Sequence, residues 1–147
     1  MTGASSKKAT LKFHVNELNM GGSRIVSEDI GTKKALSIDV SPIDQIDEVK
    51  AEKVEFIKID VEGHEFDVLR GMKKTIALNK PIIAFEQEAS EIVDGSSASI
   101  KELKEMGYNH FYSIECRRSI VTKVSEFVFS RIAVVHSWFP VLLALTS

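Results

Sequence analysis

The chain has 147 residues, of which 44% are hydrophobic and 27% charged, the ordinary range for one globular domain, so a two-domain enzyme is not expected. Nineteen Lys and Arg against 21 Asp and Glu give a net charge of −2, which leaves no single-sign excess for nucleic acid or an anionic membrane. Cys116 is the sole cysteine, which excludes an intramolecular disulfide and a multi-cysteine zinc site. This cysteine usage predicts a cytoplasmic protein.

The two ends of the chain differ in character. Residues 1–8 are small and polar and include two lysines, which predicts a disordered N-terminus rather than a secretory signal. Residues 127–145 are mostly apolar, with three interruptions, namely Arg131, His136 and Pro140. A membrane-spanning helix needs about 20 apolar residues and is destabilised by a central charge. We therefore expect 116–147 to form a buried or partner-covered helix and tail that Pro140 breaks or kinks, with membrane association through 127–145 as the less favoured alternative.

The middle of the chain alternates apolar runs with helical periodicity, which is typical of βαβ units. The predicted elements in chain order are strands over 9–15, 35–40 and 53–61, a helix over 65–78, a strand over 82–85, a helix over 98–106 ended by Gly107, and a strand over 108–114. The nearly continuous β-branched and aromatic residues of 53–61 indicate a strand covered on both faces. We therefore expect an α/β fold with a mostly parallel sheet and a βαβαβ core at 54–114.

The densest polar cluster follows the strand at 53–61. Asp60, Glu62, His64 and Glu65 lie within the six residues DVEGHE, where Gly63 permits a tight turn. Ligands of open parallel sheets bind beyond the carboxyl ends of the strands, so this turn is the candidate site. Glu62 and Glu65 are equally well explained as caps of the following helix. Asp60 stands at an apolar strand tip, where a carboxylate needs a ligand, a cation or backbone amides.

Other chemistries are less well supported. A zinc-protease pair would need a second histidine four residues after His64, where Val68 stands. Asp60, Glu62 and His64 could bind a hard cation but lack a fourth ligand, so no metal is predicted. No Gly-x-Ser-x-Gly nucleophile motif occurs, and Cys116 has no obvious histidine partner. The remaining histidines, which are expected to be packed or surface residues, are His14, His110 and His136.

Residues 54–71, VEFIKIDVEGHEFDVLRG, closely resemble the FkbM family of S-adenosylmethionine-dependent methyltransferases. The residues that match the family pattern are Lys58, Ile59, Asp60, Val61, Glu62, Gly63, Glu65, Val68, Leu69 and Gly71. Weaker similarity lies at Asn19, Gly21, Gly22 and Ser23, at Ile43, Asp44 and Gln45, at 81–86 and at 103–108. The resemblance covers about residues 9–115.

The resemblance implies a Rossmann-like class I methyltransferase fold and methyl transfer to a hydroxyl of a sugar, another glycan or a small molecule. Asp60 would lie beside the methyl donor and acceptor, where it orients the acceptor hydroxyl or takes its proton, and Glu62 and His64 would complete the catalytic set. Asp60, Val61 and Gly63 would contact S-adenosylmethionine.

The sequence departs from the family in its glycines. Such enzymes bind the methyl donor with a glycine-rich loop after the first strand and an acidic residue at the end of the second, and neither is found here. The chain therefore resembles the C-terminal portion of a partial Rossmann-like domain, at 9–115. Two hypotheses follow: an O-methyltransferase that a complementing chain or a homo-oligomer completes, or a noncatalytic remnant that acts as an interaction or self-associating module.

Overall fold

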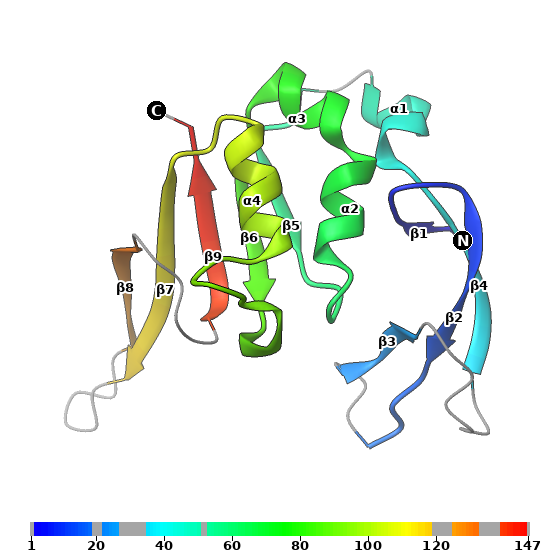
Figure 1. The fold of residues 1–147 in the computed structure, drawn as a ribbon, viewed down its shortest axis with the longest axis horizontal. Coiled ribbons are helices and arrows are strands. Elements are labelled where there is room, and N and C mark those ends of the chain that lie inside the picture. The colour runs from blue at the N-terminus through cyan, green and yellow to red at the C-terminus, as the bar shows by residue number, and fades with distance from the viewer. Residues whose placement is uncertain are drawn as a thin grey trace.

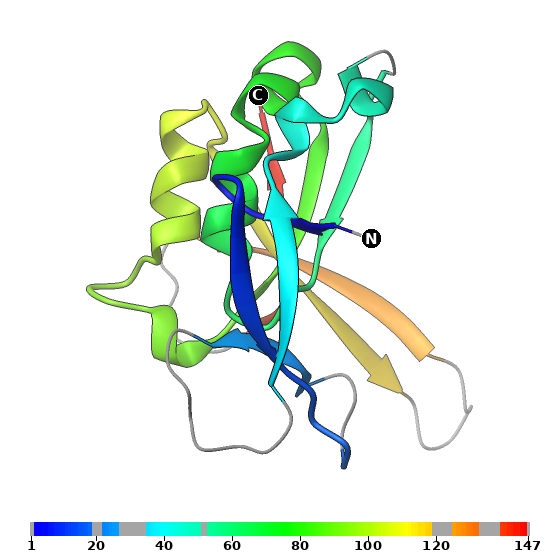
Figure 2. The ribbon, with the colours of Figure 1, turned by 90° about the vertical axis from the view of Figure 1, so that its right-hand side faces the viewer.

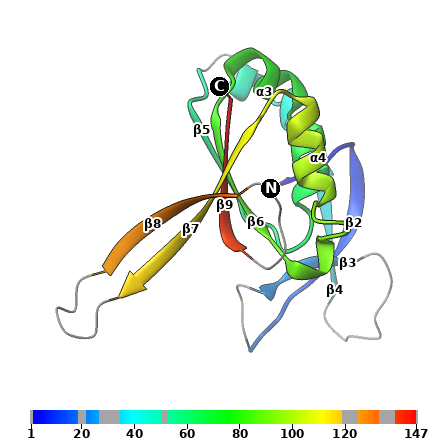
Figure 3. The same cartoon turned by 60° about the vertical axis from the view of Figure 1, so that its left-hand side comes forward.

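The computed structural model describes residues 2–18, 22–26, 35–50, 53–118, 125–132 and 139–146. These residues form two β-sheets and a set of short helices (Figure 1). Sheet A has the strand order β1-β4-β2-β3, and sheet B has the order β5-β6-β9-β7-β8. The helices α2, α3 and α4 cover one face of sheet B (Figures 1 and 3).

Sheet A is built from the N-terminal part of the chain. Its strands are β1 (Gly3–Ala4), β2 (Ala9–His14), β3 (Arg24–Val26) and β4 (Ala35–Ser41). β2 pairs antiparallel with β3 and with β4, whereas β1 pairs parallel with β4. The expected disorder of residues 1–8 is therefore wrong for β1 and Ser5, since the Ser5 amide donates to Ser41 O at 3.1 Å and Ser5 is buried. This segment is ordered because it pairs with β4, which its polar composition alone does not predict.

Sheet B contains β5 (Phe56–Ile59), β6 (Ile82–Gln87), β7 (His110–Arg118), β8 (Ser125–Ile132) and β9 (Phe139–Leu145). β5 and β6 are parallel, and β6 and β7 both run antiparallel to β9, which lies between them. The three strands of the expected βαβαβ core therefore share one direction. The prediction of a mostly parallel sheet is wrong, because β8 and β9 add antiparallel pairs and make sheet B mixed.

The expected C-terminal helix is also wrong for the described part of 127–145, which consists of β8 and β9. A continuous apolar run is compatible with a buried helix and with a buried central strand, and only its neighbours decide between them. Here β9 lies between β6 and β7, and its Leu142 and Ala144 are fully buried. The β7–β8 pair extends away from the helices (Figures 2 and 3). No helix in the described ranges is long and apolar enough to cross a membrane.

The helical elements are η2 (Ile43–Gln45), α1 (Asp47–Lys50), α2 (Glu65–Gly71), α3 (Lys73–Asn79), η3 (Ala89–Glu91) and α4 (Ala98–Glu105). The single helix expected over 65–78 is interrupted at Met72. Asp44 explains where the second piece begins, since its carboxylate accepts the backbone N–H groups of Lys74 at 2.8 Å and Thr75 at 2.9 Å. A side chain thirty residues away thus satisfies the first amides of α3.

One hydrophobic core lies between sheet B and its helices. Its buried members are Ile59, Val68, Leu69, Met72, Ile76, Ile83, Phe85, Ile100, Leu103, Tyr108, Phe111, Leu142 and Ala144. The hydroxyl of Tyr108 donates to Pro81 O at 2.7 Å, and burial raises the pKa of this phenol to about 12. The core fixes β5 and α2, and therefore the turn between them.

Candidate functional site

The turn at the carboxyl end of β5 carries the predicted site residues. Asp60 follows β5 directly, and α2 begins at Glu65. Between them Glu62 and Gly63 adopt left-handed backbone conformations, with φ of 51° and 89°. Such angles strain most residues, and Gly63 adopts them without steric cost. The chain reverses within four residues, which places the side chains of the turn at the edge of sheet B.

Glu65 holds this turn in place. Its side chain is buried, and its Oε1 accepts the backbone N–H groups of Val61 at 3.2 Å and Gly63 at 3.3 Å. The sequence allowed Glu65 to cap the helix, and the structure shows it bonding to the amides of the preceding turn instead. Its second oxygen, Oε2, is buried and has no hydrogen-bond partner among the described residues.

Asp60 forms an ion pair with Lys58 of the preceding strand, β5. Its Oδ2 accepts from Lys58 Nζ at 2.8 Å, and both side chains are about half exposed. The hydrogen bond and the charge of Asp60 raise the pKa of Lys58. Solvent and Lys58 together therefore provide the compensation that the sequence indicated this carboxylate needs.

Glu86 joins Asp60 and Glu62 from the neighbouring strand. One carboxylate oxygen from each of the three side chains lies within 4.8 Å of the others. Glu86 stands in β6 where the pairing with β9 shifts register between Phe85 and Gln87, an irregularity of the kind that redirects a side chain. Burial raises the pKa of Glu86, and the charges of Glu62 and Asp60 raise it further. The sequence missed Glu86 as a site residue, although the segment 81–86 that ends on it belongs to the resemblance.

His64 connects the turn to the N-terminal segment. Its Nε2 lies 3.0 Å from Ser5 Oγ, and its Nδ1 lies 3.8 Å from Asp67 Oδ2. Asp67 also accepts a hydrogen bond from Ser6 Oγ at 2.6 Å. Sequence reasoning missed Ser5, Ser6 and Asp67, because no local pattern shows that residues about 60 positions apart meet. The ring of His64 therefore has a neighbour at each nitrogen, which suits a residue that fixes the position of the turn.

A cavity of about 260 Å³ lies between this turn and sheet A. Its lining comprises Gly3, Ala4, Phe13, Ser23, Ile25, Ile38, Asp60, Val61, Glu62 and His64. The structure thus brings four of the five predicted site residues to one cavity, and Gly63 is not among its lining residues. Ser23, from the predicted loop, is also there, whereas Asn19 and Gly21 lie outside the described residues.

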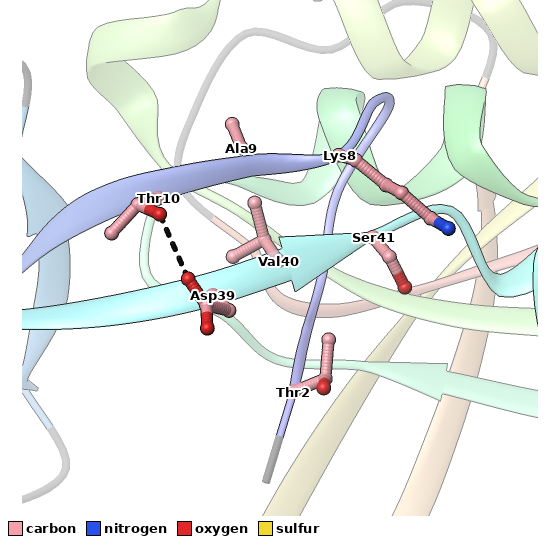
Figure 4. A pocket seen from close by; sticks show the side chains of 7 residues that line it. All are labelled: Thr2, Lys8, Ala9, Thr10, Asp39, Val40 and Ser41. Atoms are coloured by element: carbon pink, nitrogen blue, oxygen red, sulfur yellow. Dashed lines mark hydrogen bonds between the residues drawn. The ribbon is translucent and has the colours of Figure 1, made fainter.

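A second hollow, of about 550 Å³, lies along β4 and β2 (Figure 4). It is open and contains two charged side chains, Lys8 and Asp39. Asp39 accepts a hydrogen bond from Thr10 Oγ1 at 2.8 Å (Figure 4). This hollow lacks the convergent carboxylates of the turn, so the cavity beside Asp60 is the stronger candidate site.

Comparison with known proteins gives the same family as the resemblance carried by the residues of this turn. The family model described as "Methyltransferase FkbM domain" matches residues 2–109. The chain belongs to the FkbM methyltransferase family. The match begins one residue before β1 and ends one residue before β7, so it includes all of sheet A, the turn, β5, β6 and α4.

Among solved structures, the chain is similar to the crystal structure of the methyltransferase FkbM from Methylobacillus flagellatus KT, with 20% sequence identity and a TM-score of 0.44. The alignment covers 97% of this chain and 27% of that one, so this chain spans about a quarter of the length of that protein. The comparison with curated proteins gave no match.

The family implies S-adenosylmethionine as the methyl donor. The carboxylates of Asp60 and Glu62 suit the hydroxyl and ammonium groups of such a molecule. The cavity is nevertheless smaller than the roughly 300–1,000 Å³ typical of small-molecule sites, and the sequence contains no Gly-x-Gly to bring backbone amides close to a ligand. These residues therefore fit one side of the donor and not the whole molecule.

Proposed function

We propose that the chain serves the O-methylation of a small-molecule or glycan hydroxyl and forms the acceptor-binding part of the site. The cavity carries this proposal, because in it Asp60, Glu62 and His64 face the apolar wall that sheet A supplies. Carboxylates accept hydrogen bonds from hydroxyl groups, and apolar side chains pack against the carbon skeleton that bears them. A polyhydroxylated acceptor matches both halves of this lining.

We propose that Asp60 binds the hydroxyl group of the acceptor. It lines the cavity from the tip of β5, and it is accessible, with 49% of its side chain exposed. A carboxylate in this position can orient a hydroxyl and accept its proton as the oxygen gains a carbon bond. Lys58 engages one carboxylate oxygen and limits the rotation of the group.

We assign His64 a positioning role rather than that of the base. Ser5 lies within hydrogen-bond distance of Nε2, and Asp67 is the neighbour of Nδ1, so a proton taken from an acceptor would compete with an existing contact. The same contacts hold the turn against β1. A substitution at His64 should therefore alter acceptor binding more than the rate of transfer once the acceptor is bound.

Methyl transfer tests the assignment. The full chain is incubated with radiolabelled S-adenosylmethionine and a set of methyl glycosides, and the label transferred to each glycoside is measured. Asp60→Asn should reduce transfer by about 10²–10⁴-fold, the usual contribution of a general base. Asp39→Asn is the matched control, because Asp39 is an exposed carboxylate outside this cavity. Full transfer by Asp60→Asn would refute the assignment.

The second candidate function is a noncatalytic module that self-associates. The observation that favours it is the exposed apolar pair Phe56 and Ile82, which are 57% and 41% exposed and lie opposite each other in β5 and β6. Exposed apolar side chains on a strand at the end of a sheet favour pairing with another chain. Calorimetric titration with S-adenosylmethionine and with the methyl glycosides separates the two functions. No heat with either at millimolar concentration, together with a dimer in sedimentation analysis, would support the module and contradict the proposed acceptor-binding function.

A further inference from the structure

Three apolar side chains of sheet A share one face and line the cavity beside Asp60. Phe13 of β2 pairs with Ile25 of β3, and Ile38 of β4 pairs with Leu11, which stands two residues before Phe13. Residues that pair across strands, or that lie two apart along one strand, are on the same face of a sheet. Phe13, Ile25 and Ile38 therefore form one apolar wall, and all three contribute to the lining of the cavity.

The hydrophobic core does not account for this apolar wall. In the described part of the chain, Ala4 of β1 packs against the core, whereas Phe13, Ile25 and Ile38 neither belong to the core nor pack against it. Each of the three is only partly buried. Apolar side chains that border a cavity gain free energy when a ligand replaces the water beside them. The apolar wall is therefore a surface that a ligand can cover.

The cavity combines this wall with polar groups and a small volume. Asp60, Glu62 and His64 line it from the β5–α2 turn, and its volume is about 260 Å³. This volume is below the roughly 300–1,000 Å³ of sites for drug-sized ligands, so it suits one sugar ring better than two. A pyranose carries C–H bonds on its faces and hydroxyl groups around its edge. Its C–H face can pack on the wall while an edge hydroxyl reaches Asp60.

We propose that Phe13 is a specificity-determining residue that selects a single pyranose ring as the acceptor by packing against the C–H face of that ring. This inference rests on the proposed acceptor-binding function and narrows the acceptor from hydroxyl compounds in general to cyclic sugars. The face of an aromatic ring carries partial negative charge, which attracts polarised C–H groups. An acyclic polyol presents similar hydroxyl groups but no rigid face, and it loses more conformational freedom when it binds.

The test compares a cyclic with an acyclic probe of similar hydroxyl content. Methyl β-D-galactopyranoside and galactitol are each titrated into the full chain without S-adenosylmethionine, and NMR gives the two dissociation constants. We expect the parent chain to bind the pyranoside more tightly than galactitol. Phe13→Ala should weaken pyranoside binding by about five- to tenfold and leave galactitol binding unchanged, because only the ring loses an aromatic contact.

Phe13→Tyr and Phe56→Ala are the matched controls. Phe13→Tyr keeps an aromatic ring and should bind the pyranoside like the parent chain. Phe56 is 57% exposed on β5 and does not line the cavity, so Phe56→Ala should leave the affinity for both probes unchanged. The bound pyranoside should also show upfield shifts of its C–H protons in the parent chain and in Phe13→Tyr, and no such shifts in Phe13→Ala.

Two results would overturn the inference: pyranoside binding that Phe13→Ala leaves unchanged, or equal weakening of pyranoside and galactitol binding in that variant. Circular dichroism verifies folding, and Phe13→Leu, which keeps an apolar side chain without a ring, decides by the same ratio if Phe13→Ala does not fold. Failure of methylation is a separate outcome. Pyranoside binding that depends on Phe13, without methyl transfer from S-adenosylmethionine, would contradict the proposed methylation and support the selection of the ring.

Discussion

Sheet B and sheet A are stabilised by different kinds of contact. Sheet B packs against α2, α3 and α4, and its core contains large apolar side chains that are almost completely buried. In the four strands of sheet A, Val40 is the only described residue that is buried. From sheet A, Ala4 packs against this core, and the residues that follow β1 make polar contacts near the start of α2, where Ser5 meets His64 and Ser6 meets Asp67.

This difference locates the candidate site. The cavity lies where the tightly packed part of the molecule meets the loosely packed part, since its acidic lining comes from the β5–α2 turn and its apolar lining from sheet A. A rigid core can hold Asp60 and Glu62 in place while a less buried sheet adjusts to an acceptor. The comparison predicts that the two parts respond very differently to substitution.

The largest effect is expected in the core of sheet B. Leu69→Ala removes a fully buried side chain from α2 and should lower the free energy of unfolding by about 2–5 kcal/mol. Leu78→Ala is the matched control, because Leu78 on α3 is 79% exposed. Chemical denaturation measures both. Equal losses of unfolding free energy in the two variants would contradict the difference in burial between Leu69 and Leu78.

An intermediate effect is expected at the junction between the two parts. A Cβ on Gly71 would stand 2.0 Å from the carbonyl oxygen of Ser5, so Gly71→Ala must push β1 away from α2. We expect a loss of about 1–3 kcal/mol, the usual range for overpacking, and faster amide hydrogen exchange at Ala4 and Ser5 than in the parent chain.

Gly63→Ala is the comparison for this variant. Its Cβ would meet no atom within 4 Å, but the residue has φ of 89°, so the cost arises from backbone strain alone. Exchange at Ala4 and Ser5 should stay unchanged. If Gly71→Ala leaves these amides equally protected, β1 does not depend on close contact with α2.

Local sequence was sufficient for several elements in the middle of the chain, although not for the break at Met72 in the helix expected over 65–78. The strand before Asp60, the turn at Gly63 and the helix over 98–106 were predicted from periodicity and capping residues, and the structure places β5, the turn and α4 there. In these segments the residues that determine the structure are neighbours along the chain. Four of the five site residues also share a cavity because one turn carries them.

Long-range contacts determine the features that the sequence missed. The apolar run at 139–145 becomes a strand because β6 and β7 leave room for one between them. The polar residues before Ala9 become ordered through β4 and α2. Glu86 reaches Asp60 through the pairing of β6 with β5 and a register shift against β9. In each case the contacting segments are far apart in the sequence, so hydrophobic periodicity could not predict these contacts.

The smallest effect is expected from pH at the acidic cluster. The pKa of Glu86 is raised in the folded chain by burial and by Glu62 and Asp60, so the folded state binds more protons than the unfolded state above the ordinary pKa of 4.5. The free energy of unfolding contributed by this group therefore falls as pH rises from 4.5 through the raised value. Glu86→Gln cannot lose a proton and should remove this dependence.

Urea denaturation at a series of pH values from 4 to 8 measures the effect. The parent chain should lose stability relative to Glu86→Gln as pH rises, and a parallel pair of curves would contradict the assignment. The difference in free energy of unfolding between the parent chain and Glu86→Gln would thus report on the turn and not on the core of sheet B.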